Sequence, residues 1–575
     1  MILQALKDYY DRKAADPEGG IAPEGFEHKE IPFVLVLDRD GNLIQLEDTR
    51  RQVGKQTRAK RFLVPQGEKR TVGIKAYLLW DNAEYTLGLV AKGNPAKVAE
   101  RHRRFIERIL ALNINEDIGV SAVLKFLQSD PVAAISGNEH LAEIQDANPF
   151  MTFRLNEDQG LVCEREAVIN KILVTPESGT AGLCLISGET APLAVLQPAI
   201  KGVRGANTTG GNIVSFNLTA FNSFGKTQGA NAPIGKKSAF AYTTALNHLL
   251  GKDSTQKLQV GDASTLFWAD KQSHLENEFS ALFDVPPKDN PDALTDAVRS
   301  LYRAVDTGTM PVEDTQTKFF VLGLSPNAAR ISIRFWHTGT VAEFSQRIAQ
   351  HFHDLEIAHA PHERDHLSIW WMLSRIAALE KSENIPPNLA GDWMRSILSG
   401  MAYPDSLYQA ALRRIQAERE VSYPRAAILK ACLNRKARFQ HQPEKEITVS
   451  LDKENKNPGY RLGRLFAALE KIQEEAQPGI NATIRDRYYA SASGTPASVM
   501  PILMRLKNHH LAKLEKGRSI YFERLLGEII GELSDFSAQL NLHDQGLFAI
   551  GYYHQRQNFF TKSTTTESHT TEQGE

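Results

Sequence analysis

Short apolar runs separated by turn residues characterise the first part of the sequence. Residues 33–37 are all apolar, and Asp40-Gly41, a dipeptide typical of tight hairpin turns, separates them from a second apolar run. The strands expected from such runs are 33–37, 43–46, 182–187, 212–216, 319–324 and 331–336. Because hairpins rather than long helical crossovers join them, we predict an α+β N-terminal region with antiparallel strands over residues 1–340.

After residue 340, apolar side chains recur with the period of a helix, most clearly between Tyr460 and Ile472. The helices expected are 341–352, 367–379, 482–491, 499–514, 520–533 and 546–560, with one more that starts at Tyr460 and ends at Gln477. Short loops between the last of them favour an all-α C-terminal helical bundle.

These patterns divide the remainder of the chain into three segments. We expect a helical connector with a basic segment at 341–448 and the C-terminal helical bundle at 449–560. Residues 561–575 are rich in Thr, Ser and Glu and contain no apolar side chain. Because such a segment cannot bury a core, it is predicted to be a disordered tail.

Composition narrows the class of protein. The 575 residues include 67 Lys and Arg against 68 Asp and Glu, with 42% hydrophobic residues, which is typical of a globular protein and excludes disordered and collagen-like chains. Three cysteines without a Cys-x-x-Cys pattern fit a reducing cytoplasm and argue against a thiolate zinc site. No apolar run approaches the roughly 18 residues of a membrane span, so we expect a cytoplasmic protein with no membrane partner.

Basic residues concentrate in three runs although the net charge is only −1. Residues 50–75 contain nine bases and one acid, residues 201–257 seven bases and one acid, and residues 413–438 eight bases and two acids. A single run of this kind is usually only a solvated surface. Three separate runs in a neutral chain favour local contacts with a polyanion.

Two short motifs suggest a hydrolase as an alternative. His362, Glu363 and His366 match HExxH, which on a helix holds zinc between two imidazoles. Pro361 places the motif at a helix start, which favours a solvated surface instead. Lys226 follows Gly225 as in a phosphate-binding loop, but Ala220 stands where that loop requires its first glycine. We therefore expect no catalytic residue, no cofactor and no metal.

A longer pattern surrounds Lys226. Glycines and the polar residues Asn222, Lys226, Gln228 and Asn231 lie between an expected strand and an expected helix. Asn and Gln side chains can bond base edges, and a Lys can neutralise a phosphate or contact guanine. These four residues are therefore candidates for contacts in a DNA groove, while a turn-rich surface loop is the simpler interpretation.

The sequence resembles a known family, the large subunit of the type I-C CRISPR surveillance complex, Cascade. The residues that carry the resemblance, over nearly the whole chain, are 80–82, 210–217, 220–233, 239–247, 418–427, 457–466 and 551–557. The resemblance implies a non-catalytic subunit in antiviral defence that recognises the protospacer-adjacent motif in double-stranded DNA, promotes duplex opening and supports R-loop formation.

The resemblance also implies the partners. These are the guide CRISPR RNA, double-stranded target DNA, the backbone and crRNA-processing subunits of Cascade, and a separate helicase-nuclease that is recruited after R-loop formation. In this family the gene carries an internal start that yields a small helical subunit. Val449, just before the first strongly periodic helix, is the expected start here, and Met401, upstream of the basic helices, is the alternative.

Two further sets of bases complete the candidate site. The residues expected to contact a phosphate backbone are Arg58, Lys60, Arg61, Lys69, Arg70, Lys201, Arg204, Lys236 and Lys237. The residues of the bundle expected to contact R-loop strands are Arg461, Arg464, Arg485, Arg487, Lys507 and Lys513. Exposed bases on helices are about as often only solubilising charge.

Overall fold

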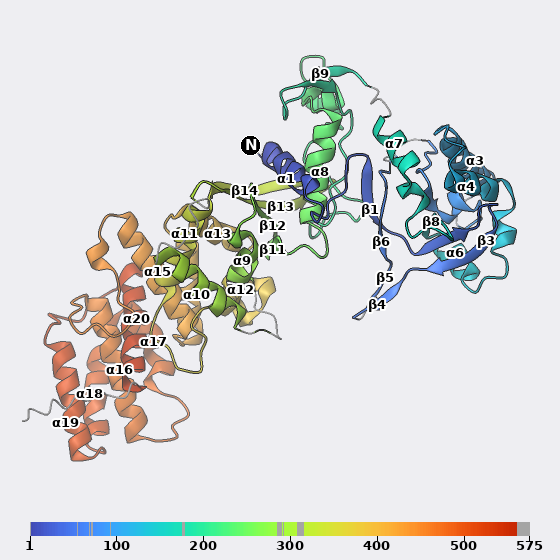
Figure 1. Cartoon of the computed structure of the whole chain (residues 1–575). Helices are drawn as coiled ribbons and strands as arrows, with labels where there is room; N and C mark the ends of the chain where they lie inside the picture. Colours follow the sequence, from blue (N-terminus) through green and yellow to red (C-terminus); the bar gives the residue numbers. More distant parts are fainter. Residues whose placement is uncertain are drawn as a thin grey trace, which may run out of the picture. The chain divides into compact units, whose positions relative to one another are not determined.

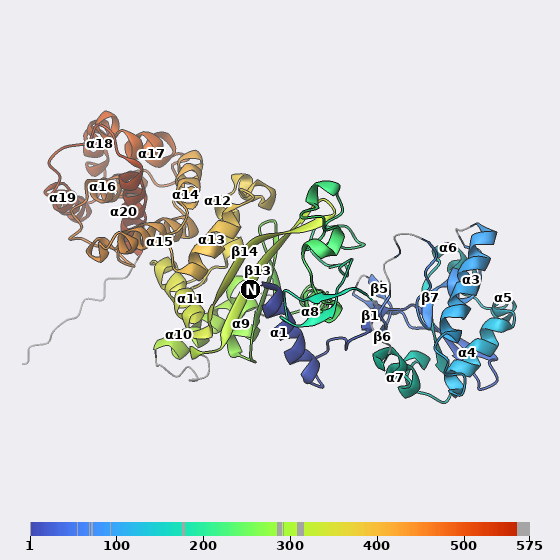
Figure 2. The same cartoon turned by 90° about the horizontal axis from the view of Figure 1, so that it is seen from above.

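The computed structural model describes residues 2–54, 56–67, 70, 73–91, 94–174, 179–284, 290, 292–306 and 315–560. The chain forms two compact units, drawn from two directions in Figures 1 and 2. The N-terminal unit comprises Met1–Gly202 and Asn207–Gly251, and the C-terminal unit comprises Val203–Ala206 and Lys252–Glu575. The predicted tail, 561–575, lies outside the described residues.

A four-stranded sheet forms the centre of one part of the N-terminal unit. Its strands are β2 (Phe33–Leu37), β3 (Leu43–Asp48), β7 (Trp80–Asn82) and β8 (Phe150–Leu155), in the order β3-β2-β8-β7. The predicted β2–β3 hairpin is confirmed, while β2 and β8 run parallel. Helices pack with this sheet in one hydrophobic core, which accounts for the burial of all five side chains of β2. The helices of this region are α2 (Ala83–Thr86), α3 (Pro95–Leu110), α4 (Ile118–Gln128), α5 (Pro131–Ala134), α6 (Leu141–Ala147) and α7 (Glu166–Val174).

The rest of the N-terminal unit joins segments that are distant in sequence. The strand β1 (Phe26–Glu30) pairs antiparallel with β6 (Arg61–Pro65). The helix α1 (Ile2–Ala15) packs against α8 (Lys236–Leu249), with the rings of Tyr10 and Phe240 5.6 Å apart. Two short antiparallel pairs complete the unit: β4 (Arg51–Val53) with β5 (Gln56–Arg58), and β9 (Ala181–Leu183) with β10 (Thr190–Pro192).

Two of the predicted strands need correction. The segment 182–187 is extended only at its start, where β9 ends at Leu183. Residues 212–216 form no strand; the backbone at the start of this segment makes isolated bridges, among them the one between Ile200 and Gly211. The loop that follows is therefore held by side chains and by turns rather than by a sheet.

A second four-stranded sheet, antiparallel throughout, opens the C-terminal unit. Its strands follow chain order: β11 (Lys257–Val260), β12 (Ala263–Ala269), β13 (Lys318–Asn327) and β14 (Arg330–Thr340). The predicted β13–β14 hairpin is confirmed. Apolar side chains of this sheet share a core with α9 (His274–Phe283), α10 (Ala293–Asp306) and α11 (Val341–Leu355). Antiparallel strands in both units confirm the predicted α+β character.

The chain from about residue 389 to residue 560 is mostly helical, which confirms the second half of the predicted fold. The helices after α11 are α12 (Ile369–Ile376), α13 (Leu389–Ser399), α14 (Asp405–Glu418), α15 (Tyr423–Phe439), α16 (Pro458–Ala476), α17 (Ile484–Gly494), α18 (Pro496–Leu511), α19 (Lys516–Ile530) and α20 (Leu542–Phe560). No described helix is long and apolar enough to cross a membrane.

Two glycines allow α16 and α20 to approach closely. A Cβ atom at Gly463 would overlap the carbonyl oxygen of Phe548, and one at Gly551 would overlap that of Tyr460. The start of α16 is fixed by Asn457, whose Oδ1 accepts a hydrogen bond from Tyr460 N at 3.2 Å, with Pro458 at the first helical position. Because their backbones approach so closely at the two glycines, α16 and α20 form the central pair of the bundle.

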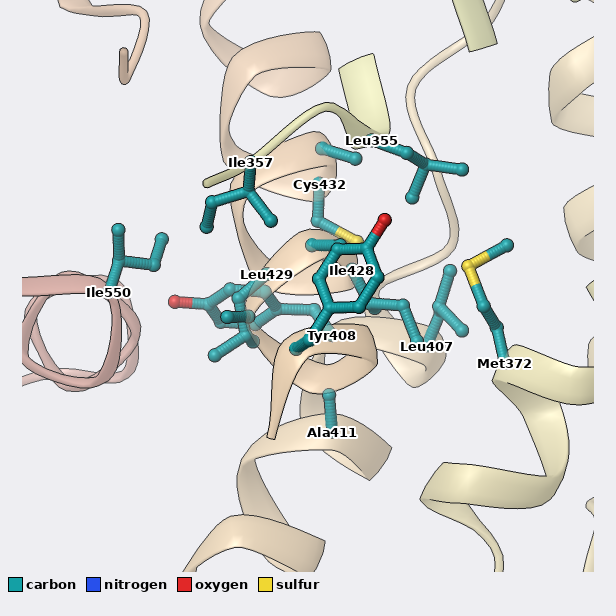
Figure 3. Close-up of a cluster of buried hydrophobic side chains, with 14 of the residues drawn as sticks. Leu355, Ile357, Met372, Leu407, Tyr408, Ala411, Ile428, Leu429, Cys432 and Ile550 are labelled. Atoms are coloured by element: carbon teal, nitrogen blue, oxygen red, sulfur yellow. The ribbon is translucent and has the colours of Figure 1, made fainter. Parts of the chain in front are cut away.

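The hydrophobic core of the C-terminal unit is continuous. Buried side chains form one cluster from Leu258 on β11 to Tyr553 on α20. Figure 3 shows part of it, in which side chains of α14, α15 and α20, among them Tyr408, Leu429 and Ile550, belong to one buried cluster. The core thus continues across both expected domain boundaries, 340/341 and 448/449. These two boundaries remain predictions.

An ion cluster is buried within the same unit. Asp354 of α11 is 2% exposed, and its carboxylate accepts hydrogen bonds from Arg435 at 3.0 Å and from Arg438 at 2.7 Å. Arg435 is itself buried and also donates to the carbonyl of Met401 at 3.1 Å. Bases of the run 413–438 therefore serve to join α11 to α15.

Candidate nucleic-acid interface

The loop from Asn222 to Asn231 has a defined conformation. Ser223 and Lys226 form an isolated antiparallel bridge, with Lys226 N donating to Ser223 O at 2.9 Å. The two residues between them, Phe224 and Gly225, have φ values of 51° and 69°. Positive φ at both central positions is the arrangement of tight hairpin turns. The segment is thus a turn that projects two residues at its tip.

Asn231 holds this turn from inside. Its Oδ1 accepts a hydrogen bond from Ser223 N at 3.0 Å, and its Nδ2 donates to the carbonyls of Lys226 at 3.2 Å and Gln228 at 3.0 Å. A side chain with these three bonds has little capacity left for a base edge. Asn231 therefore positions the loop, and the expectation that it contacts a groove directly does not suit its surroundings.

The base of the loop is fixed against a neighbouring segment. Gly229 N donates to Val195 O at 3.2 Å, and a Cβ atom at Gly229 would overlap the carbonyl oxygen of Ala194. The side chains of Asn222, Lys226 and Gln228 are exposed. Three of the four predicted motif-reading residues are therefore presented together on a backbone that is held in place.

Basic groups from distant parts of the sequence gather near the end of α8. Burial lowers the pKa of His248 to about 4. The charges of Lys13, Arg61 and His28 lower this pKa further. They come from α1, β6 and β1, which the pairing of β1 with β6 and the packing of α1 on α8 bring together.

Lys29 extends this group toward Lys201. Burial lowers the pKa of Lys29, and the charge of Lys201 lowers it further, while Glu27 and Glu30 act in the opposite direction. The Lys29 Nζ lies 4.1 Å from the centre of the Phe150 ring. We call the following residues the basic cluster: Lys13, His28, Lys29, Arg61, Lys201 and His248.

The structure places the predicted phosphate-contacting residues in different settings. Lys60, Arg61, Lys201, Arg204 and Lys237 are exposed, and Arg58 and Lys236 are half-buried. Lys237 Nζ lies 3.6 Å from a Glu24 oxygen, and Arg204 belongs to the C-terminal unit. Lys69 lies outside the described residues. Only Arg61 and Lys201 of this set fall within the basic cluster.

The contacts of Arg70 within the protein correct its expected role as a phosphate-contacting residue. Its guanidinium is bonded to the buried carboxylate of Asp81, and its Nε donates to the carbonyl of Lys75 at 2.7 Å. It also stacks over Tyr77, 3.9 Å from the ring centre. Because removing Asp81's partner would leave a buried carboxylate unpaired, Arg70 stabilises this region and is a poor candidate for a phosphate contact.

The predicted strand-contacting bases of the bundle also separate into two groups. Arg464 is fully buried and bonds to Gln555 at 3.1 Å and Glu528 at 2.7 Å, while Arg461 is 3% exposed and donates to the carbonyls of Glu528 and Ile529. These two do not reach the surface, so their assignment is corrected to structural residues. Arg487 and Lys513 are exposed, and Arg485 and Lys507 are half-buried.

The two short motifs of the hydrolase alternative do not adopt the geometry that zinc or phosphate binding by these motifs requires. Residues 361–366 form turns and bends rather than a helix, so the HExxH pattern does not place His362 and His366 on one helical face. Lys226 lies in the turn, ten residues before α8 begins at Lys236, and not at a helix start as in a phosphate-binding loop. Within the described parts of the chain, no group of three or more His, Cys, Asp or Glu could hold a metal ion.

Sequence reasoning missed Phe224 and most of the basic cluster. Phe224 stands before Gly225 between two paired residues, a position that Asn usually occupies in tight turns, so the local signal was available. Lys13, Lys29 and His248 carry no local signal, because only long-range packing brings them together.

Comparison with known proteins identifies one family. A family model described as CRISPR-associated protein (Cas_Csd1) matches residues 6–560. No curated protein matches the chain.

Proposed function

Since the chain belongs to the family of CRISPR-associated proteins described as Cas_Csd1, we propose that it is the non-catalytic large subunit of a type I-C Cascade. In this role it recognises the protospacer-adjacent motif in double-stranded DNA, promotes duplex opening and R-loop formation, and supports recruitment of a separate helicase-nuclease. Guide RNA pairing supplies the rest of the sequence specificity.

The turn at 222–231 is the observation that carries this proposal. Asn222, Lys226 and Gln228 are exposed on a backbone that Asn231 and Gly229 hold in place. Amide side chains suit base edges, and an ammonium suits a phosphate or guanine. Because the loop is already ordered, reading a groove requires little additional loss of conformational entropy.

The basic cluster provides the complementary electrostatics. Lys13, Arg61 and Lys201 supply positive charge in the same unit as the turn, although the whole chain is close to neutral. Phosphate contacts position a protein on a duplex without reading its sequence. We therefore assign base reading to the turn and backbone positioning to the cluster.

The direct test is selection of target DNA from a library. The complex is assembled with guide RNA and its partner subunits and mixed with duplexes that share one target and carry randomised flanking bases. We expect the bound fraction to be enriched in one short motif, and the DNA to remain uncut until the helicase-nuclease is added. Uniform recovery of all flanks would contradict motif recognition by this complex.

Reversing charge within the basic cluster should weaken DNA binding in a salt-dependent way. For the variant Arg61→Glu with Lys201→Glu, we expect the slope of log affinity against log salt to fall by about one per lost phosphate contact, because fewer counterions are released on binding. Titrations at several salt concentrations measure this slope. Lys97→Glu on α3, exposed and outside the basic cluster, is the control with the same change per residue. An unchanged slope in the double variant would identify the cluster as an ordinary solvated surface.

A further inference from the structure

Four apolar side chains are exposed around the hairpin of β9 and β10. Leu183 and Leu185 are 60% and 66% exposed, and Val195 and Leu196, just after the hairpin, are 62% and 53% exposed. Single exposed apolar side chains are ordinary on a protein surface, whereas a group of them marks an interaction site. We call these four residues the apolar patch.

Backbone hydrogen bonds attach both halves of the apolar patch to one segment. Leu185 N donates to Pro233 O at 2.9 Å, and Val195 O accepts a hydrogen bond from Gly229 N at 3.2 Å. The segment 229–233 also forms the base of the turn that presents the candidate motif-reading residues. The apolar patch is therefore fixed to this base and does not consist of side chains on unrelated loops.

The charge of this region does not suit a nucleic-acid backbone. Residues 179–200 contain no Lys, Arg or His, and Glu189 is their only acid. Lys236 approaches the hairpin, since its Cε would lie 3.7 Å from a Cβ atom at Gly179, but its side chain is half-buried. Binding of a phosphate backbone depends on cations that reach the phosphates. An exposed apolar surface without such cations is typical of a contact between proteins.

Acidic groups beside the hairpin indicate the chemistry of the partner. Lys7 of α1 donates a hydrogen bond to Asp11 at 2.6 Å, which raises the pKa of Lys7, and the charges of Asp8 and Glu189 raise this pKa further. Three acids therefore act on one lysine. A complementary surface is apolar and carries basic residues at its margin. A second copy of this chain would present the same acids and so fits less well.

We propose that the apolar patch docks a neighbouring protein subunit of the complex, through an apolar surface of that subunit with basic residues at its margin. This inference rests on the proposed function, in which the chain is one subunit of a ribonucleoprotein. Removal of the four side chains from water supplies the driving force for docking. Because the segment 229–233 carries both the patch and the turn, docking also restrains the base from which the turn projects.

Two variants test the apolar contact and the charge separately. Leu185→Asp with Val195→Asp places two carboxylates in the apolar patch and leaves the backbone bonds available. Glu189→Lys reverses the acid beside it. Leu110→Asp with Ile118→Asp, which are 42% and 44% exposed on α3 and α4 of the same unit, is the matched control. Thermal unfolding of each purified chain checks that the variants fold.

The experiment titrates the full chain into a complex assembled from guide RNA and the other subunits. For the double variant in the apolar patch we expect a loss of affinity of roughly 30-fold or more, the effect of removing a central anchor of an interface. The control should stay within about twofold of the unaltered chain, as is usual for surface substitutions. Glu189→Lys should weaken binding at low salt and have less effect at high salt, because salt screens the lost attraction.

Equal affinities for the double variant and the control would overturn the proposal. If the double variant does not fold, a photoreactive benzophenone side chain at position 185 of the otherwise unaltered complex decides the question. A cross-link to another protein subunit supports docking, whereas cross-links only to RNA, to DNA or to a second copy of this chain, or none at all, overturn it.

The proposed function fails by a different result. At concentrations that restore assembly of the double variant, we expect the same preference for motif-bearing DNA as in the unaltered complex, because Asn222, Lys226 and Gln228 are unchanged. A preference that stays lost after assembly is restored would assign the apolar patch to DNA reading and overturn docking as its role. Absence of any preference in the unaltered complex would contradict motif recognition, and the affinities of the variants would still test the patch.

Discussion

Alanine at Asn222, Lys226 and Gln228 together should abolish most of the preference for motif-bearing DNA. Each good base contact contributes about 1–3 kcal/mol of discrimination, so the loss of two amide contacts should cost at least about 2 kcal/mol, or roughly 30-fold. Loss of Lys226 should in addition weaken binding to all sequences about equally. Competition between motif-bearing and motif-free duplexes separates the two effects.

Asn231→Ala provides the contrast for this experiment. It removes the side chain that bonds to Ser223, Lys226 and Gln228, and it leaves the three exposed groups in place. We expect faster amide exchange within the turn and a partial loss of preference. An unchanged preference in the triple variant would assign motif reading to another part of the complex.

Replacing Asp354 by alanine should destabilise the C-terminal unit by about 3–5 kcal/mol, because it leaves the buried guanidinium of Arg435 without its carboxylate. The midpoint of urea unfolding, followed in the full chain, measures the change. Arg438 loses the same partner but keeps its contact with Glu446 at 2.8 Å.

Asp392→Ala is the matched control for Asp354. Asp392 lies on the surface of α13, 3.2 Å from Arg395, and an exposed pair of this kind contributes about 0–1 kcal/mol. Equal midpoints for the two variants would contradict a structural role for the buried cluster. A large loss for Asp354→Ala alone would explain why part of the basic run at 413–438 is retained without any contact to nucleic acid.

Local patterns predicted the elements that depend on neighbouring residues. The hairpins β2–β3 and β13–β14 were predictable because an apolar run, a turn and a second run lie within a short stretch of sequence. The strand β1 was not, because Phe-Glu-His-Lys-Glu is mostly polar and pairs with β6, about 35 residues later. Its stability comes from a partner that no local pattern indicates.

The candidate site was predictable only in part for the same reason. Asn222, Lys226 and Gln228 lie in one loop, and their exposure agrees with the sequence-based expectation. Arg461 and Arg464 resembled solvated bases on an amphipathic helix, but α16 is surrounded by other helices, so its polar positions are buried as well. Their charges are satisfied by Glu528, Gln555 and backbone carbonyls.

The continuous core of the C-terminal unit bears on the shorter product that the resemblance leads us to expect from a start at Val449. In the full chain, Tyr408 of α14 donates a hydrogen bond to the carbonyl of Leu542 at 2.8 Å, and α15 packs against α20 in the cluster of Figure 3. A polypeptide beginning at Val449 lacks both α14 and α15, so this face of α20 would meet water. The same helices would then occur in two proteins. In the full chain, α14 and α15 cover the apolar face of α20, whereas in the shorter product another subunit must cover that face.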